Sequence, residues 1–170
     1  MTQAPELMVS QWFNTDAELS LVALRGKVVV IEAFQMLCPG CILRGIPLAQ
    51  SIARTFSADQ VAVIGLHTVF EHHAAMQPVS LEAFLHEFRV SFPVAVDAAG
   101  PDGFPKTMTA YQMRGTPSLL VIDRDGALRA HYFGHVSELQ IGAVIASLIA
   151  PEPVQFTPTG SEVSGVGCAD

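Results

Sequence analysis

Two nearly continuous apolar runs predict strands that are buried on both faces. The first spans residues 28–34 and is broken only by Glu32, and the second spans residues 61–66. Between them, apolar residues recur at helical spacing over residues 41–56, and we expect Pro47 to kink that helix. A right-handed crossover through the helix makes the two strands parallel neighbours. Their carboxyl ends should therefore share one edge of the sheet.

Weaker patterns predict the remaining elements. They lie at residues 8–24 (a strand and a turn), 81–88 (a helix capped by Ser80), 93–97 (a strand), 107–111 (a helical turn) and 137–148 (a helix that opens with a capping box). Two further apolar runs, at residues 118–122 and 127–133, flank a turn that ends in Gly126, which is typical of a β-hairpin. The pattern as a whole predicts an α/β fold.

The length of the chain suits a single domain. It has 170 residues, of which 50% are hydrophobic, and this is enough for one buried core but not for two. We assign residues 1–150 to the domain. Residues 151–170 contain three prolines and three glycines but no lysine or arginine, so we expect an extended C-terminal tail.

The net charge of −7 argues against nucleic-acid and anionic-membrane partners, because the sequence contains no basic stripe or cluster. No apolar run reaches the roughly 18 residues that a membrane span needs, and the first residues do not form a basic leader. We therefore expect a cytoplasmic protein, or a periplasmic one if a leader has been trimmed. The mean hydropathy of +0.39 is high for a soluble chain and predicts a homodimer that buries apolar surface.

The candidate chemistry lies where the first buried run meets the helix, in the sequence Cys38-Pro39-Gly40-Cys41. Two cysteines at this spacing share one helical turn, so their sulfurs can close a disulfide or open to a dithiol with little backbone movement. The helix N-terminus presents free N–H groups and a partial positive charge, which favour a thiolate at Cys38. Cys38 is therefore the predicted attacking sulfur. The third cysteine, Cys168, lies in the tail as a passive thiol or as a third redox thiol.

The order of the elements, together with Gly115-Thr116-Pro117 at the entry to the hairpin, resembles the thioredoxin superfamily. It resembles most closely the TlpA/ResA-type thiol-disulfide oxidoreductases. The resemblance implies a thioredoxin-like three-layer α/β/α sandwich with a mixed central sheet and an inserted strand and helix. It also implies disulfide exchange without a cofactor, with a protein or small-molecule disulfide as substrate and a second redox partner. Two residues depart from the family: Leu37 replaces the usual tryptophan, and Pro47 falls one residue later than the helix proline of most relatives.

The resemblance assigns roles to residues on both sides of the site. It implies that Cys38 is the exposed nucleophile and that Cys41 is the buried resolving thiol. It also implies that Pro117 is a cis proline facing the dithiol, and that Thr116 presents backbone groups to a substrate strand. The sequence alone does not establish the isomer, and the alternative is an ordinary proline at the entry to a strand.

Glu32 is the third candidate catalytic residue, because it lies six residues before Cys38 in a strand buried on both faces. Desolvation should raise the pKa of its carboxyl group, which can then accept the proton of Cys41. Thioredoxins keep a buried acid at this offset. The alternative is a carboxylate that accepts a local hydrogen bond or pairs with Lys27 or Arg44.

The segment at the end of the second buried run holds histidines and a glutamate on the predicted active edge. The candidates for a lid, a proton relay or a metal site are His67, Phe70, Glu71, His72 and His73. The alternative is a solvated loop without a catalytic role.

Two other functions compete with disulfide exchange. A peroxiredoxin-like peroxidase needs proline and threonine seven and three residues before the reactive cysteine, where this chain has Ile31 and Gln35. A soft-metal protein would bind Cu(I) or Zn(II) through Cys38, Cys41 and His67. A second ligand pair with zinc-site spacing is missing from the sequence, so we expect no metal.

Overall fold

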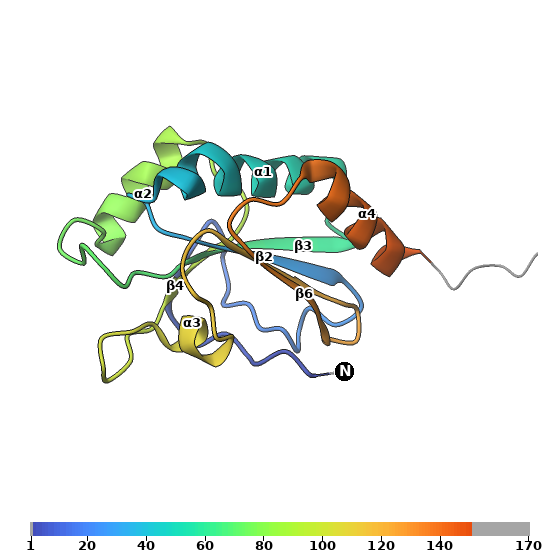
Figure 1. Ribbon diagram of the computed structural model, residues 1–170, viewed down its shortest axis with the longest axis horizontal. Helices are drawn as coiled ribbons and strands as arrows, with labels where there is room; N and C mark the ends of the chain where they lie inside the picture. Colours follow the sequence, from blue (N-terminus) through green and yellow to red (C-terminus); the bar gives the residue numbers. More distant parts are fainter. Residues whose placement is uncertain (1, 151–170) are drawn as a thin grey trace, which may run out of the picture.

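A mixed sheet of six strands runs through the middle of the computed structural model, which describes residues 2–150 (Figure 1). The strands are β1 (Val9–Phe13), β2 (Val28–Phe34), β3 (Val61–His67), β4 (Val94–Asp97), β5 (Ser118–Ile122) and β6 (Leu128–Phe133). Their order across the sheet is β1-β4-β3-β2-β5-β6. The central strands β2, β3 and β4 are parallel, whereas β1, β5 and β6 pair in the antiparallel sense. The tail expected at residues 151–170, with Cys168, lies outside the described residues.

Helices cover both faces of the sheet. One face packs against α1 (Ile46–Thr55), α2 (Pro78–Glu87) and α4 (Glu138–Ile149), and the other against the short α3 (Lys106–Ala110) and the N-terminal segment (Figure 1). Successive β2 side chains alternate between the two cores: Phe34 belongs to the core that includes Phe84 of α2 and Ile141 of α4, whereas Ile31 belongs to the core that includes Met108 of α3. The predicted three-layer α/β/α sandwich is confirmed.

Most element boundaries match the sequence prediction, but the start of α2 does not. The hairpin forms, and Ser137 caps α4 by accepting the Gln140 backbone N–H at 3.2 Å. The predicted cap at Ser80 is wrong, because α2 begins two residues earlier at Pro78. Proline is favoured in the first helical turn, where its missing N–H leaves no hydrogen bond unmade. Phe88 lies just after α2 and is 45% exposed, so it is not part of the buried face.

The ends of β2 and β3 lie side by side, and this fixes the position of the site. Their last residues, Phe34 and His67, are partners in the sheet register. The segment after β2 carries both cysteines, so the dithiol and the segment after β3 leave the sheet at one edge, as predicted. In Figure 1 the segment between β2 and α1 lies on the left.

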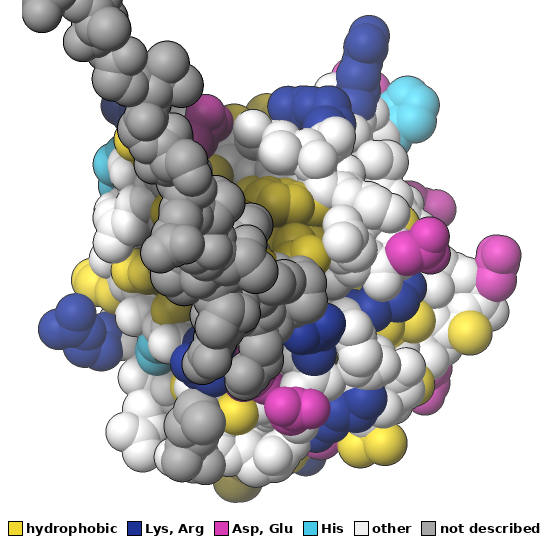
Figure 2. All heavy atoms as spheres, turned by 90° about the vertical axis from the view of Figure 1, so that its right-hand side faces the viewer, with side chains coloured by type: hydrophobic (Ala, Val, Ile, Leu, Met, Phe, Trp, Pro, Cys, Tyr) yellow, Lys and Arg dark blue, Asp and Glu magenta, His cyan; other side chains and the backbone are white. Residues whose placement is uncertain are grey.

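Figure 2 shows the end of the molecule opposite the dithiol, where hydrophobic side chains gather in a hollow. An apolar pocket of about 320 Å³ lies at this end, beside the start of β3 and the end of α1, and its lining includes Phe56, Val61 and Phe92.

No helix within residues 2–150 combines the length and the apolar character needed to cross a bilayer.

Candidate active site

A π-helical turn carries the second cysteine. This turn, η1 (Cys41–Gly45), precedes α1, and the Ile46 backbone N–H closes it by donating to the Cys41 carbonyl. Such a turn accommodates one residue more than an α-helical turn. The extra residue fits the expectation, which came from the resemblance, that Pro47 falls one residue later than the helix proline of that family. Pro47 itself lies in the first turn of α1, where its missing N–H is tolerated, so it begins this helix rather than kinking it from within as expected.

The two sulfurs have different surroundings. Cys38 is partly exposed, whereas Cys41 is completely buried, and both thiols are free. The Cys41 backbone N–H donates to Cys38 Sγ at 3.2 Å. An N–H group directed at a sulfur stabilises negative charge there, as the free N–H groups at the start of a helix do. This geometry fits Cys38 as the attacking sulfur.

Burial determines the protonation state of the second thiol, Cys41. It raises the pKa of Cys41 to about 12, and the hydrogen bond with the Cys38 side chain adds to the increase. Cys41 therefore remains a neutral thiol at physiological pH until a neighbouring group takes its proton.

The Thr116–Pro117 peptide bond is cis, as the resemblance implied. The Cys38 thiol donates to the Thr116 carbonyl at 3.5 Å, so the loop before β5 lies directly beside the attacking sulfur. Pro117 also packs closely on the dithiol turn, because a Cβ atom added at Gly40 would lie 3.2 Å from Pro117 Cδ. The structure thus brings Cys38, Cys41, Thr116 and Pro117 together, as predicted from the sequence.

Glu32 lies in the middle of β2 and is 1% exposed. Its Oε1 has no hydrogen-bond partner among the described residues. Burial raises the pKa of this carboxyl group well above its ordinary value, and the Cys38 charge raises it further. Lys27 does not pair with it but donates to the Ala58 carbonyl at 2.8 Å, and no ion pair to Arg44 forms within residues 2–150. The structure therefore fits a desolvated acid rather than a carboxylate in an ion pair.

Gln35 joins the segments around the dithiol, and sequence reasoning did not assign it this role. Its side chain is buried, and its Oε1 accepts the Phe70 backbone N–H at 3.2 Å. Its Nε2 donates to Thr116 Oγ1 at 3.4 Å and to Glu71 Oε1 at 3.5 Å. A polar residue at the end of an apolar run was the one available signal. The side chain links the loops after β2, after β3 and before β5.

The placement of His67 in the loop is wrong. His67 is the last residue of β3, it is 1% exposed, and its ring lies 5.3 Å from the ring of Phe34. Burial lowers the pKa of its imidazole to about 4, so the ring is neutral at physiological pH. A buried neutral side chain inside a strand cannot serve as a lid.

The rest of the segment after β3 divides into exposed and packed residues. Glu71, His72 and His73 are exposed, whereas Phe70 packs against the core on the α3 side of the sheet. Within residues 2–150, no three histidine, cysteine or acidic side chains come together in an arrangement that could hold a metal ion. The soft-metal hypothesis therefore lacks its third ligand, since His67 points into the core.

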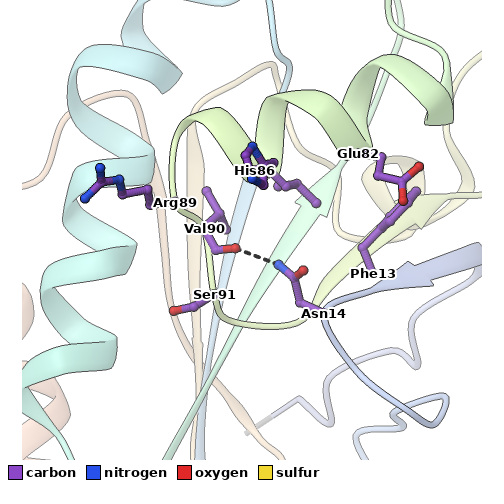
Figure 3. A pocket seen from close by; sticks show the side chains of 8 residues that line it. Phe13, Asn14, Glu82, His86, Arg89, Val90 and Ser91 are labelled. Atoms are coloured by element: carbon purple, nitrogen blue, oxygen red, sulfur yellow. Dashed lines mark hydrogen bonds between the residues drawn. The ribbon is translucent and has the colours of Figure 1, made fainter.

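A separate hollow of about 510 Å³ lies between the end of β1 and the segment after α2 (Figure 3). Asn14 anchors its wall by donating to the Val90 carbonyl at 2.7 Å and to the Phe92 carbonyl at 3.1 Å. Its lining contains neither cysteine nor Glu32, so we place the candidate chemistry at the dithiol.

Comparison with known proteins identifies the family. The profile of the AhpC/TSA family matches residues 1–131. The chain belongs to the AhpC/TSA family. Ile31 and Gln35 stand where a peroxidase needs proline and threonine, and the structure buries Ile31 in the core and uses Gln35 to join three loops. The peroxidase alternative is therefore not favoured.

Two similar solved structures cover nearly the whole domain. The thioredoxin-like superfamily protein SPOA0173 is 64% identical, with a TM-score of 0.87 over 89% of this chain and 98% of that protein. A thiol-disulfide isomerase from Corynebacterium glutamicum is 48% identical, with a TM-score of 0.83 over 87% of this chain and 97% of that protein. The DipZ protein of Mycobacterium bovis is 31% identical over 134 residues, but these make up only 18% of its length. The thioredoxin-like fold is confirmed.

Proposed function

We propose that the protein is a thiol-disulfide oxidoreductase that acts through the Cys38–Cys41 pair. The observation that carries this function is the setting of Cys38 Sγ, which accepts the Cys41 N–H at 3.2 Å and faces the Thr116 carbonyl at 3.5 Å. Family membership and the solved relatives, one of them described as a thiol-disulfide isomerase, support it.

In the first step, the Cys38 thiolate attacks one sulfur of a client disulfide. The client S–S bond breaks, a Cys38–client disulfide forms, and the second client sulfur leaves as a thiolate that takes a proton from solvent. The loop at Thr116 offers backbone groups to an extended client segment, which fits a protein disulfide as the substrate.

In the second step, Glu32 accepts the proton of Cys41, and the resulting thiolate attacks Cys38 Sγ. The mixed disulfide breaks, the Cys38–Cys41 disulfide forms, and the client leaves with two electrons gained. Glu32 suits this role because burial raises its pKa, so its carboxylate is a stronger base than an exposed one. A second redox partner must then reduce the Cys38–Cys41 disulfide.

Reduction of insulin disulfides tests the proposal. Cys38→Ser should abolish turnover, whereas Cys41→Ser should accumulate a covalent Cys38–client adduct that mass spectrometry detects. Cys168→Ser is the matched control and should keep the wild-type rate. Equal rates for wild type and Cys38→Ser would refute the proposed function.

The homodimer and the cytoplasmic location stay predictions. The homodimer rests on the mean hydropathy of +0.39, and light scattering during gel filtration would contradict it by giving the mass of one chain. Fractionation of the native cells tests the location, since recovery of the protein outside the cytoplasmic fraction would contradict it.

A further inference from the structure

The carboxyl group of Glu32 lies against a glycine at the end of the π turn. A Cβ atom added at Gly45 would lie 3.0 Å from Glu32 Cδ and still closer to Oε1. The same atom would lie 3.2 Å from Pro117 Cβ. An alanine at position 45 therefore cannot fit unless Glu32 or the start of α1 moves.

The strand and the turn together create this contact. Glu32 points to the same face of the sheet as Val30 and Phe34, which is the face that α1 covers. The π turn η1 places Gly45, which is buried, over the middle of β2. A glutamate is one methylene longer than an aspartate, so its carboxyl group reaches into the space that a side chain at position 45 would otherwise fill.

We propose that Gly45 is the positioning residue for Glu32, because its missing side chain leaves the space in which the carboxyl group lies between β2 and the start of α1. The catalytic consequence rests on the proton-accepting role proposed for Glu32, whereas the structural claim does not. The carboxyl has no cationic partner in the described part of the chain, and the charged group that acts on it is Cys38. Packing rather than an ion pair therefore holds it in place.

The first experiment compares Gly45→Ala with Gly142→Ala. Gly142 lies in α4, and a Cβ atom added there meets nothing within 4 Å, so this variant is a matched helical control. The readout is the ¹³C NMR titration of the Glu32 carboxyl carbon, assigned by its absence in Glu32→Gln. We expect Gly45→Ala to move the Glu32 titration towards lower pH, because the carboxyl is displaced from its buried position, and Gly142→Ala to leave it unchanged. An unchanged titration in Gly45→Ala would overturn the proposal.

The second experiment measures how fast Cys41 displaces a thionitrobenzoate bound to Cys38 at pH 7. We expect Gly45→Ala to slow this step by about tenfold or more, which is part of the roughly 10²–10⁴-fold that a positioned base contributes. In a Glu32→Asp background, Gly45→Ala should slow the displacement of thionitrobenzoate by less than about twofold, because the shorter side chain leaves room for the methyl group. An equal slowing by Gly45→Ala in wild-type and Glu32→Ala backgrounds would overturn the proposal.

Two further outcomes separate the possible failures. If Glu32→Gln releases thionitrobenzoate as fast as wild type, the proton-accepting role fails, and the NMR titration alone decides the positioning claim. If Gly45→Ala does not fold, the Gly45→Ala, Glu32→Asp double variant should fold, because the shorter acid relieves the collision. Failure of both variants to fold would overturn the proposal.

Discussion

At the scale of single residues, the two thiols of one short turn differ most in burial. Cys38 is reachable from solvent, whereas Cys41 is buried and its pKa is raised to about 12, chiefly by that burial. A thiolate and not a thiol is the nucleophile in disulfide exchange. The surroundings of the sulfurs therefore set the order in which they react.

Alkylation should show this difference directly. In a Cys168→Ser background, iodoacetamide at pH 7 should modify Cys38 and leave Cys41 unmodified in the folded protein. After unfolding, both should react, which serves as the control. Peptide mass spectrometry measures the extent at each site, and similar rates at the two cysteines in the folded protein would contradict the prediction.

The buried carboxyl group of Glu32 should reduce the stability of the fold at neutral pH. Burial raises the pKa of Glu32 above the ordinary 4.5, so the folded protein keeps this proton where the unfolded chain has lost it. Stability should therefore fall as the pH rises from the unfolded pKa through the folded one. Glu32→Leu removes this pH-dependent loss of stability. The Tm of the variant should therefore exceed that of wild type by more at pH 8 than at pH 4. In the same variant, displacement of a client from Cys38 should become slower. Calorimetry at the two pH values checks the prediction, which an equal Tm difference at both would contradict.

At the scale of elements, the site depends on loops that a single side chain holds together. Gln35→Leu keeps the size of that side chain but removes its hydrogen bonds to Phe70, Glu71 and Thr116. We expect a loss of about 0.5–1.5 kcal/mol in the free energy of unfolding, because the three hydrogen bonds are only partly buried and solvent can replace some of them. The KM for a peptide disulfide should rise more than kcat falls, since the sulfurs stay in place.

Urea unfolding and steady-state kinetics test this prediction. Gln11→Leu, at an exposed position of β1, is the matched control and should change neither quantity. A Gln35→Leu variant with wild-type stability and KM would show that the loops hold their positions without the amide.

The elements that the sequence predicted best are those whose signal is local. The apolar runs predicted β2 and β3, because a strand buried on both faces needs apolar side chains at nearly every position. The turn at Gly126 predicted the hairpin, and the cysteine spacing predicted the dithiol. The cis bond at Pro117 came from the resemblance alone, since a trans proline gives the same letters.

The features that were missed depend on contacts between distant residues. A glutamine at the end of a strand looks the same in the sequence whether it faces solvent or three loops, so the role of Gln35 was not visible. His67 was placed in a loop because the apolar run ends at Leu66, although the strand continues for one more residue. Gly45, at the end of the π turn, packs against the carboxyl group of Glu32 in β2, and this contact between two elements is one that no local pattern records.

At the scale of the whole molecule, one buried imidazole should make the fold sensitive to acid. His67 titrates at a pKa of about 4 in the folded protein and at the ordinary 6.5 in the unfolded chain. Between these values the unfolded chain binds one proton more, so stability should fall as the pH falls from 6.5 to 4, by up to about 3 kcal/mol.

Substitution of the imidazole should reduce this acid sensitivity. His67→Leu should lose less stability than wild type between pH 7 and pH 4 in urea unfolding. His86→Gln is the matched control, since its side chain is 85% exposed, and it should follow the wild-type curve. A His67→Leu curve parallel to that of wild type would show that other groups account for the acid sensitivity.

The partner of Cys38 at Thr116 lies 78 residues further along the chain, just before a strand in the interior of the sheet. A ribosome therefore releases the CPGC segment well before it makes β5. Until then the nascent chain exposes two thiols without the strand that would align a client beside them. Selective disulfide exchange thus arises only on completion of the domain, and a prematurely terminated product would be an unselective thiol.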